Sequence, residues 1–265
     1  MDIPVYEVFA IKYAERSGRR PEHFVGGDPH DSAMPMDYFI WLVRNEERVI
    51  LVDTGFDAAM AAKRKRTLVR EPRDGLALLG VKATDVRDVV ITHMHNDHAG
   101  TFFDFPNASF HLQDEEMAFV TGRHMRHTMF SRPYEVDHVI GMVRLVFKDR
   151  VIFHRGDDEI APGVSVHHIG GHTMGLQCVR VHTKRGWVVI ASDASHYYEH
   201  METRRCFPLV FDMGEMLEGY DKLRRLAASP KHIIPGHDPL VMTRYPPVAK
   251  ELEGIAVRLD VEPNE

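Results

Sequence analysis

Residues 89–98 read Val-Val-Ile-Thr-His-Met-His-Asn-Asp-His, and they are the most informative stretch of the chain. The three β-branched apolar residues at its start are typical of a buried strand. Four side chains that can bind a metal ion follow within six residues: His93, His95, Asp97 and His98. Side chains that leave the end of one strand can converge on a small volume, and imidazole and carboxylate are ligands for zinc and its neighbours. The stretch therefore predicts a metal site at the end of a strand.

Three later segments place a histidine or an aspartate after another apolar strand. His172 follows a predicted strand that ends at Ile169, Asp193 follows residues 187–191, and His237 follows Ile233-Ile234. Functional side chains commonly lie on loops that a rigid scaffold positions. We therefore expect these three side chains to join the four of the first stretch, although they are distant in the sequence.

The remaining pattern alternates strands with helices. Strands are predicted over 5–13, 38–43, 48–53, 109–112, 151–154, 164–169, 176–182 and 187–192. Helices are predicted over 57–70, from 114, over 134–147, over 214–228 and near 247–258, and residues 17–36 are predicted to form an irregular loop. No linker divides the chain, so we expect one domain over residues 1–265. Two β-rich halves with helices between the strands favour an α/β fold with four αββα layers.

Composition excludes several functional classes. The 265 residues include 33 Lys and Arg against 39 Asp and Glu, a formal charge of −6 that argues against a general nucleic-acid partner. The longest apolar runs are about five residues, whereas a membrane-spanning helix needs roughly 20, so no membrane partner is expected. The two cysteines, Cys178 and Cys206, are too few for a disulfide framework. A cytoplasmic location is the expectation that fits these features.

The order of these metal-binding residues resembles that of the metallo-β-lactamase superfamily, over roughly residues 37–240. The resemblance implies two divalent metal ions, zinc by default, with iron, manganese or cobalt also accepted by such ligands. One ion would be held by His93, His95 and His172, and the other by Asp97, His98 and His237, with Asp193 bridging the two. Asp53, in the turn Asp53-Thr54-Gly55, would orient a ligand histidine, and His168 is a candidate for similar support.

Within the superfamily the chain looks most similar to the N-acyl homoserine lactonases, in its length and in the hairpin before Asp53. The resemblance implies that a hydroxide shared by the metals attacks the lactone carbonyl, while Asp97 returns the proton to the leaving alkoxide. One departure is clear, because the lactonases have a tyrosine three residues after the bridging aspartate. Here that position is His196, followed by Tyr197, and either side chain is a candidate contact for the carbonyl. An acyl pocket is expected to include Met34, Met36 and Phe102.

Other functions stay open at this point. The same site could hydrolyse another small cyclic ester, a cyclic amide or a thioester, and less plausibly a phosphodiester. A metal-binding module without catalysis is a further alternative. A zinc β-lactamase is disfavoured, because those enzymes usually carry cysteine or serine where this chain has Asp193. The expected partner is a small-molecule substrate, and the sequence leaves the oligomeric state open.

Overall fold

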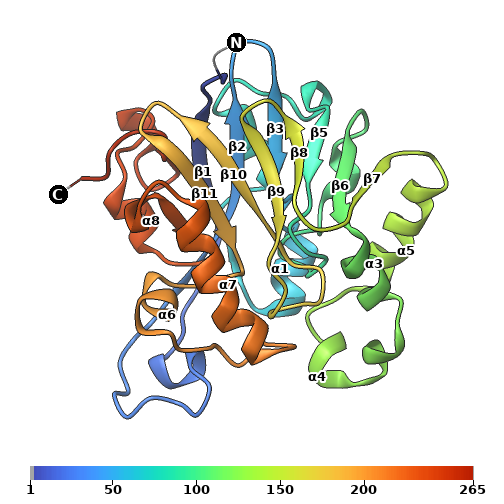
Figure 1. Ribbon diagram of the computed structural model, residues 1–265, viewed down its shortest axis with the longest axis vertical. Coiled ribbons are helices and arrows are strands. Elements are labelled where there is room, and N and C mark those ends of the chain that lie inside the picture. The colour runs from blue at the N-terminus through green and yellow to red at the C-terminus, as the bar shows by residue number, and fades with distance from the viewer. Residues whose placement is uncertain (1–2, 265) are drawn as a thin grey trace.

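The computed structural model describes residues 3–264 and shows two β-sheets packed face to face, with helices against their outer faces (Figure 1). The predicted four-layered αββα architecture is thereby confirmed. Because each sheet is covered by the other sheet on one face and by helices on the other, its central strands are apolar throughout. These layers bring the ends of distant strands to one edge of the molecule.

The first sheet has eight strands in the order β13-β1-β2-β3-β5-β6-β7, with β4 pairing with β1. Strands β3, β5, β6 and β7 are parallel to one another, and β1, β2 and β3 form an antiparallel meander. The strands are β1 (Glu7–Arg16), β2 (Met36–Arg44), β3 (Val49–Val52), β4 (Thr67–Leu68), β5 (Asp88–Val90), β6 (Ser109–Gln113), β7 (Val151–His154) and β13 (Ala256–Arg258).

The second sheet has five strands in the order β12-β11-β10-β9-β8. Its strands are β8 (Asp158–Ala161), β9 (Val164–His168), β10 (Gln177–Thr183), β11 (Gly186–Ser192) and β12 (Ile233–Pro235). Strand β12 runs parallel to β11, so the loops that follow both strands leave from the same edge. Asp193 and His237 are therefore brought together by strand pairing.

Helices cover both outer faces. The α-helices are α1 (Ala58–Arg64), α2 (Pro72–Ala77), α3 (Asp114–Val120), α4 (Thr128–Ser131), α5 (Val136–Val146), α6 (Tyr198–Thr203), α7 (Met213–Leu226) and α8 (Leu240–Arg244). Short 3₁₀ turns span Arg20–His23, Ala83–Asp85, Phe102–Asp104, Arg123–Arg126, Pro230–His232 and Lys250–Leu252. None of the helices in the described part of the chain is long and apolar enough to cross a membrane.

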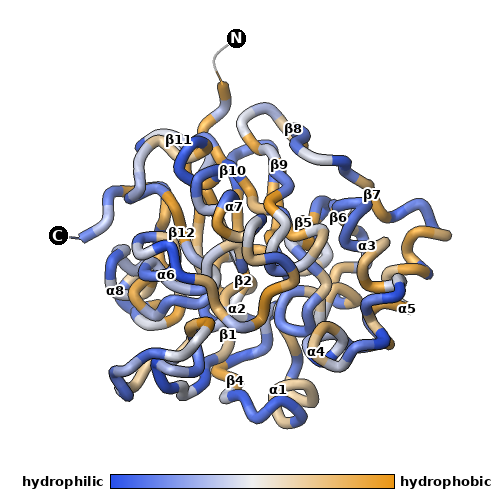
Figure 2. The backbone as a smooth tube through the Cα atoms, turned by 60° about the horizontal axis from the view of Figure 1, so that its bottom comes forward, coloured by the Kyte–Doolittle hydropathy of each residue, from blue (hydrophilic) through white to orange (hydrophobic). Residues whose placement is uncertain are grey.

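Strand β2 shows how the core is divided. Phe39, Trp41 and Val43 point into the core between the sheets, whereas the alternate residues Ile40 and Leu42 pack toward the helices on the other face. All five are fully or almost fully buried. Many hydrophobic segments accordingly lie in the middle of the molecule, although α5 at its edge is also largely hydrophobic (Figure 2).

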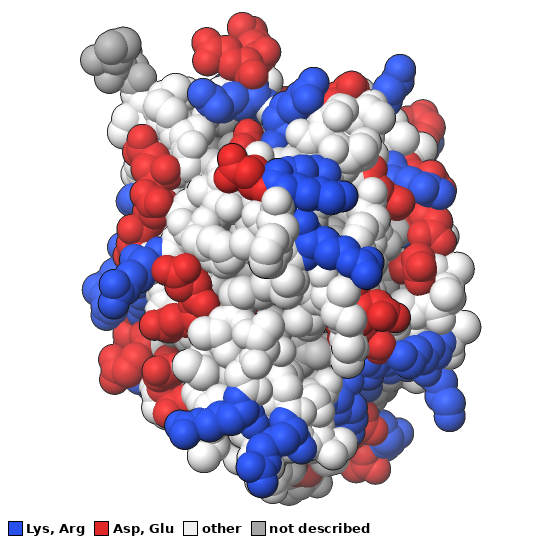
Figure 3. All heavy atoms as spheres, turned by 90° about the vertical axis from the view of Figure 1, so that its right-hand side faces the viewer, with Lys and Arg blue, Asp and Glu red and all other residues white. Residues whose placement is uncertain are grey.

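The side of the molecule formed by α5 and β7 has an uncharged centre framed by charged side chains (Figure 3). Apolar side chains exposed on these two elements include Val136, Ile140, Phe147, Ile152 and Phe153. None of these five side chains lines the cavity over the predicted metal-binding residues.

Three sequence predictions are corrected here. The helix predicted near 247–258 is wrong, because this segment forms a 3₁₀ turn and then strand β13, which pairs with the outer side of β1. The helix predicted over 57–70 ends at Arg64, where Lys65 adopts a left-handed conformation and the chain turns into β4. Strand β8 was not predicted, since Asp158–Ala161 carries two acidic residues and lies at the edge of its sheet.

Candidate metal centre

The loops after β5, β9, β11 and β12 bring the seven predicted ligands together. Candidate ligand atoms of His93, His95, His172 and Asp193 lie within 4.8 Å of one another, and so do those of Asp97, His98 and His237. Six of the seven side chains are buried, while Asp97 is partly exposed. The structure thus forms two adjacent ligand groups from residues up to 144 positions apart (237 − 93).

The Asp193 carboxylate lies between the two groups. Its Oδ2 atom is 3.2 Å from Nε2 of His172 and 3.8 Å from Nε2 of His93. Its Oδ1 atom is 3.0 Å from Nε2 of His237 and 3.3 Å from Nε2 of His98. One carboxylate therefore presents an oxygen to each group.

Hydrogen bonds from Nδ1 fix the orientation of each of three histidine rings. Nδ1 of His98 faces an Asp53 carboxylate oxygen at 2.7 Å, Nδ1 of His172 faces the Leu209 carbonyl at 2.6 Å, and Nδ1 of His237 faces the Asp37 carbonyl at 2.9 Å. These acceptors require a proton on Nδ1, which leaves Nε2 of each ring as the atom that can bind a metal ion. All three Nε2 atoms point at Asp193, in the arrangement expected of metal ligands with supporting partners.

The donor set fits bound cations. Nδ1 of His95 lies 3.0 Å from Nε2 of both His93 and His172. Burial holds the pKa values of His93 and His95 well below their usual range, which favours neutral rings whose nitrogens can bind a metal ion. His98 Nε2 and Asp193 Oδ1 are buried without a hydrogen-bond partner in the described part of the chain. A cation bound among these atoms would give the close ring nitrogens, His98 Nε2 and Asp193 Oδ1 a bonding partner.

Asp53 lies beside the centre, where its carboxylate faces the His98 ring. It follows β3 with a φ of 60°, an unusual conformation that turns its side chain toward the loop after β5. Its carboxylate accepts hydrogen bonds from the backbone N–H and the hydroxyl of Thr92, both at 2.8 Å, besides the one from His98. Burial raises the pKa of Asp53, and these donors oppose that shift.

Glu116 is a supporting residue that the sequence reasoning missed. The side chain is fully buried, and its Oε1 atom accepts hydrogen bonds from the Met94 backbone N–H (2.8 Å) and the Tyr134 hydroxyl (3.2 Å). Its Oε2 atom accepts from the Thr173 hydroxyl (2.6 Å) and the Gly175 backbone N–H (3.2 Å). One carboxylate thus ties the loop of His93 and His95 to the loop of His172.

The sequence contained little signal for this role. Glu116 is the last of three consecutive acidic residues at the start of α3, a pattern that ordinarily marks a solvated helix N-terminus. Gly175 is the structural counterpart, since a Cβ atom there would lie 2.0 Å from the Glu116 backbone nitrogen. Helix α3 and the His172 loop can approach so closely only because this residue is glycine.

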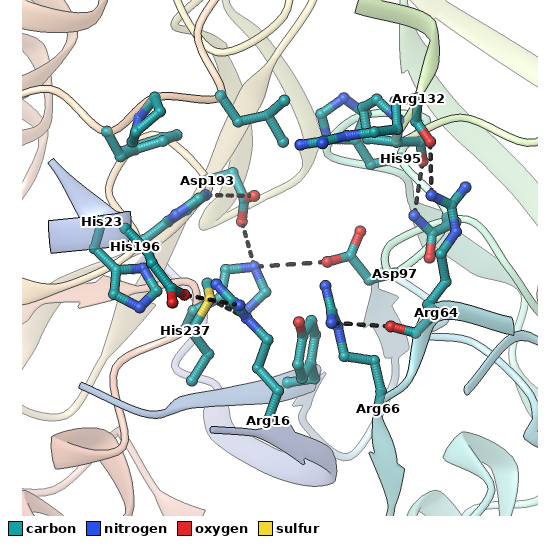
Figure 4. A pocket seen from close by; sticks show the side chains of 18 of the residues that line it. Arg16, His23, Arg64, Arg66, His95, Asp97, Arg132, Asp193, His196 and His237 are labelled. Carbon is teal, nitrogen blue, oxygen red and sulfur yellow. Dashed lines mark hydrogen bonds and ion pairs between the residues drawn. The ribbon is translucent and has the colours of Figure 1, made fainter. Parts of the chain in front are cut away.

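A cavity of about 700 Å³ opens above the centre (Figure 4). Asp97, Asp193, His196, His237 and His95 form part of its wall, together with apolar side chains that include Met36. This volume accommodates a small-molecule ligand. The metal-binding atoms are therefore accessible to a substrate.

Four other predicted residues do not line this cavity. Phe102 is buried against Phe103 and Phe110, and Met34 packs in the core around it through a partly buried side chain. The Tyr197 hydroxyl donates to the Pro35 carbonyl at 3.1 Å. His168 contacts the Met174 carbonyl at 2.7 Å and Glu115 at 2.9 Å, away from the ligand groups.

His196 does line the cavity, but its ring faces Asp193. Its Nε2 atom lies 2.9 Å from Asp193 Oδ2, and its ring stacks on Phe207 with centroids 3.6 Å apart. Burial holds the pKa of His196 well below its usual range, so the ring is neutral. A neutral ring whose Nε2–H is given to Asp193 has no second proton to offer a substrate.

Comparisons with known proteins agree with this geometry. A profile described as the metallo-beta-lactamase superfamily matches residues 34–237. An N-acyl homoserine lactonase of Bacillus cereus is 27% identical over 214 residues, covering 75% of this chain and 80% of that protein. A probable metallo-hydrolase of Mycobacterium tuberculosis is 25% identical over 232 residues, covering 76% and 71%.

Solved structures share the fold. A quorum-quenching N-acyl homoserine lactone lactonase superposes with a TM-score of 0.75 at 23% identity, covering 91% of this chain and 95% of that one. A dizinc quorum-quenching lactonase with a bound product superposes with a TM-score of 0.69 at 20% identity, covering 90% of each chain. The profile match spans most of the sequence and includes all seven residues of the centre. The chain belongs to the metallo-beta-lactamase superfamily and is a metal-dependent hydrolase.

Proposed function

We propose that the protein opens lactone rings at a centre of two metal ions, and that N-acyl homoserine lactones are the first substrates to test. The observation that carries the proposal is the Asp193 carboxylate, which presents one oxygen to each of two ligand groups at the base of an open cavity. The lactonase relatives named above support the choice of substrate class.

His93, His95 and His172 would hold one ion, Asp97, His98 and His237 the other, and Asp193 would contact both. Two divalent ions bound there, zinc in the first instance, supply Lewis acidity and lower the pKa of water toward neutrality. The protein fixes these ligands before substrate arrives, because Asp53, Asp37 and Leu209 hold the ring orientations. Preorganised charge of this kind lowers the barrier to attack on a carbonyl.

Asp97 is assigned the proton transfer to the leaving alkoxide. Its side chain is 19% exposed, and its Oδ2 atom lies 3.8 Å from Nε2 of His98 and 3.9 Å from Nε2 of His237. The Tyr13 hydroxyl anchors the Asp97 backbone through its carbonyl at 2.8 Å, while no hydrogen bond within the described residues constrains the carboxylate. A carboxylate in contact with both cavity and centre can collect a proton and release it to the ring oxygen.

The contact to the lactone carbonyl is assigned to Tyr38 rather than to His196 or Tyr197. His196 donates to Asp193 and orients it, and the Tyr197 hydroxyl is engaged with backbone carbonyls. Tyr38 lines the cavity beside His237, with ring centroids 4.9 Å apart. Burial, followed by the nearby charge of Asp97, raises the pKa of Tyr38, so its phenol stays protonated and can donate a hydrogen bond.

A second candidate function is hydrolysis of another small cyclic ester, a cyclic amide or a thioester. The observation that favours it is His196, which stands where the lactonase group has tyrosine. A phosphodiester substrate is a weaker candidate, since the relatives named above are a lactonase and a probable metallo-hydrolase.

The test is a proton-release assay on metal-loaded protein with N-acyl homoserine lactones of short, medium and long acyl chains. Thioester and phosphodiester substrates are assayed in parallel. We expect lactone turnover that disappears on chelation and returns when metal is restored. Turnover of thioesters or phosphodiesters without any lactone opening would refute the proposal.

A further inference from the structure

The cavity wall beyond the metal ligands is strongly cationic. Arg16, Arg64, Arg66 and Arg132 line it, whereas Glu22 is the only acidic side chain there apart from the ligands Asp97 and Asp193. The whole chain has the opposite balance, with 39 acidic against 33 basic residues. Cationic side chains are therefore concentrated where a substrate enters.

Two of the four arginines already have protein partners. Arg64 donates to the backbone carbonyls of Arg132 and Tyr134 at 2.7 and 3.3 Å and pairs with Glu135 at 2.5 Å. Arg16 contacts Met36 Sδ at 3.1 Å and lies 3.7 Å from a carboxylate oxygen of the exposed Glu22. The Arg64 guanidinium is therefore engaged by the protein, whereas the charge of Arg16 is opposed only by the more distant Glu22 carboxylate.

Arg66 and Arg132 are the unneutralised members of the set. Within residues 3–264 neither guanidinium has a carboxylate oxygen within 4.0 Å. Arg66 donates to the Arg64 carbonyl at 3.0 Å and lies over the Tyr38 ring at 5.8 Å. In Figure 4, Arg16 and Arg66 lie on one side of the cavity below His237 and Asp97, and Arg132 lies opposite, beside His95.

The excess of positive charge around the cavity favours an anionic ligand. Two divalent ions with Asp97 and Asp193 leave a positive centre, and the adjacent guanidiniums add to that charge. An apolar acyl chain in this cavity would cover the guanidinium donors without pairing them, which is costly. A carboxylate pairs with a guanidinium through two parallel hydrogen bonds, the geometry for which arginine is suited.

We propose that the substrate carries a carboxylate remote from the ester that is hydrolysed, and that Arg66 and Arg132 bind it, with Arg16 contributing to the local field. This inference rests on the proposed lactone hydrolysis and narrows its substrate class to anionic lactones. The metal centre contacts the ring carbonyl, and the arginines hold the other end of the substrate. An extended apolar tail is correspondingly disfavoured.

The test compares N-glutaryl homoserine lactone with its terminal primary amide, which has nearly the same shape and no charge. We expect metal-loaded protein to favour the acid in kcat/KM by about tenfold or more, because a charge-assisted hydrogen bond is stronger than a neutral one. The acid-to-amide ratio should fall by about tenfold in Arg66→Gln and in Arg132→Gln, and added salt should reduce it. Arg126→Gln, an exposed residue of the turn Arg123–Arg126 that does not line the cavity, is the matched control and should retain the ratio.

A binding measurement separates this inference from the proposed function. The corresponding γ-lactams, which resist spontaneous hydrolysis, are titrated into metal-loaded protein by calorimetry as the acid and as the amide, and are recovered afterwards to verify that the ring is intact. Tighter binding of the acid that is lost in both cavity variants and kept in Arg126→Gln supports the arginine site, whether or not lactones are turned over. Equal binding of acid and amide, or a preference for the acid that survives both cavity substitutions, overturns it.

Discussion

Replacing Glu116 with glutamine tests whether this buried carboxylate positions both ligand loops. Each of its oxygens accepts one backbone N–H and one hydroxyl, from Met94 with Tyr134 and from Gly175 with Thr173. A hydroxyl can rotate to accept from the new NH₂ group, but a backbone N–H cannot. Whichever way the amide is oriented, one backbone N–H is left facing another donor.

The expected cost follows from that single unpaired group. A buried donor without a partner costs about 1–3 kcal/mol, a substantial part of the roughly 5–15 kcal/mol that stabilises a typical domain. Met94 lies between the ligands His93 and His95, and Thr173 follows the ligand His172, so the strain reaches the centre. Loss of such supporting contacts lowers metal affinity by about 10–100-fold.

Two assays measure these effects. Denaturant unfolding of chelated protein gives the loss of stability, and competition with a chromogenic chelator gives the metal affinity. Glu115→Gln is the matched control, because this neighbour is exposed and loses only a surface pair with His168, worth about 0–1 kcal/mol. If Glu116→Gln and Glu115→Gln behave alike in both assays, Glu116 does not hold the loops.

Three further predictions concern the centre and its surroundings. Asp193→Ala should remove bound metal and lactone turnover together, and metal analysis that still finds two ions in an active variant would contradict the bridging role. Tyr38→Phe should lower kcat/KM at least about tenfold with unchanged metal content, because one donor to the carbonyl oxygen is lost. Burial lowers the pKa of His200 from 6.5 to about 4. As the pH falls from above 6.5 toward 4, His200 is protonated in the unfolded chain but not in the folded chain, so the folded state loses stability. Chelated wild-type protein should therefore lose more stability between pH 7.5 and 5 in denaturant unfolding than His200→Gln does, and equal losses would refute this assignment.

The metal-binding residues could be predicted because each of them follows closely after an apolar strand in the sequence. The stretch after β5 supplies four candidate ligands at once, and each later ligand follows an apolar strand that is recognisable from its own composition. Strand pairing then brings these loops together. Strands β11 and β12 run parallel, so Asp193 and His237 lie at the same edge of the sheet.

Features that depend on packing between distant segments were not predictable in this way. Glu116 sits in a run of acidic residues with no distinguishing pattern. Arg66 and Arg132 line the same cavity only because the segments that follow α1 and α4 both border it. The segment before β13 has residues compatible with a helix, but the unpaired edge of β1 recruits Ala256–Arg258 as a strand. Tertiary context overrode local preference there.

Titration of metal-free protein with zinc, with proton release from a lactone measured at each addition, tests the central claim most directly. The proposal of two metal ions sharing Asp193 predicts that lactone turnover rises until two equivalents are bound per chain and then levels off. Full turnover at one equivalent would contradict the shared centre. Absence of lactone turnover at two equivalents, with thioester or phosphodiester hydrolysis in its place, would contradict the assigned reaction.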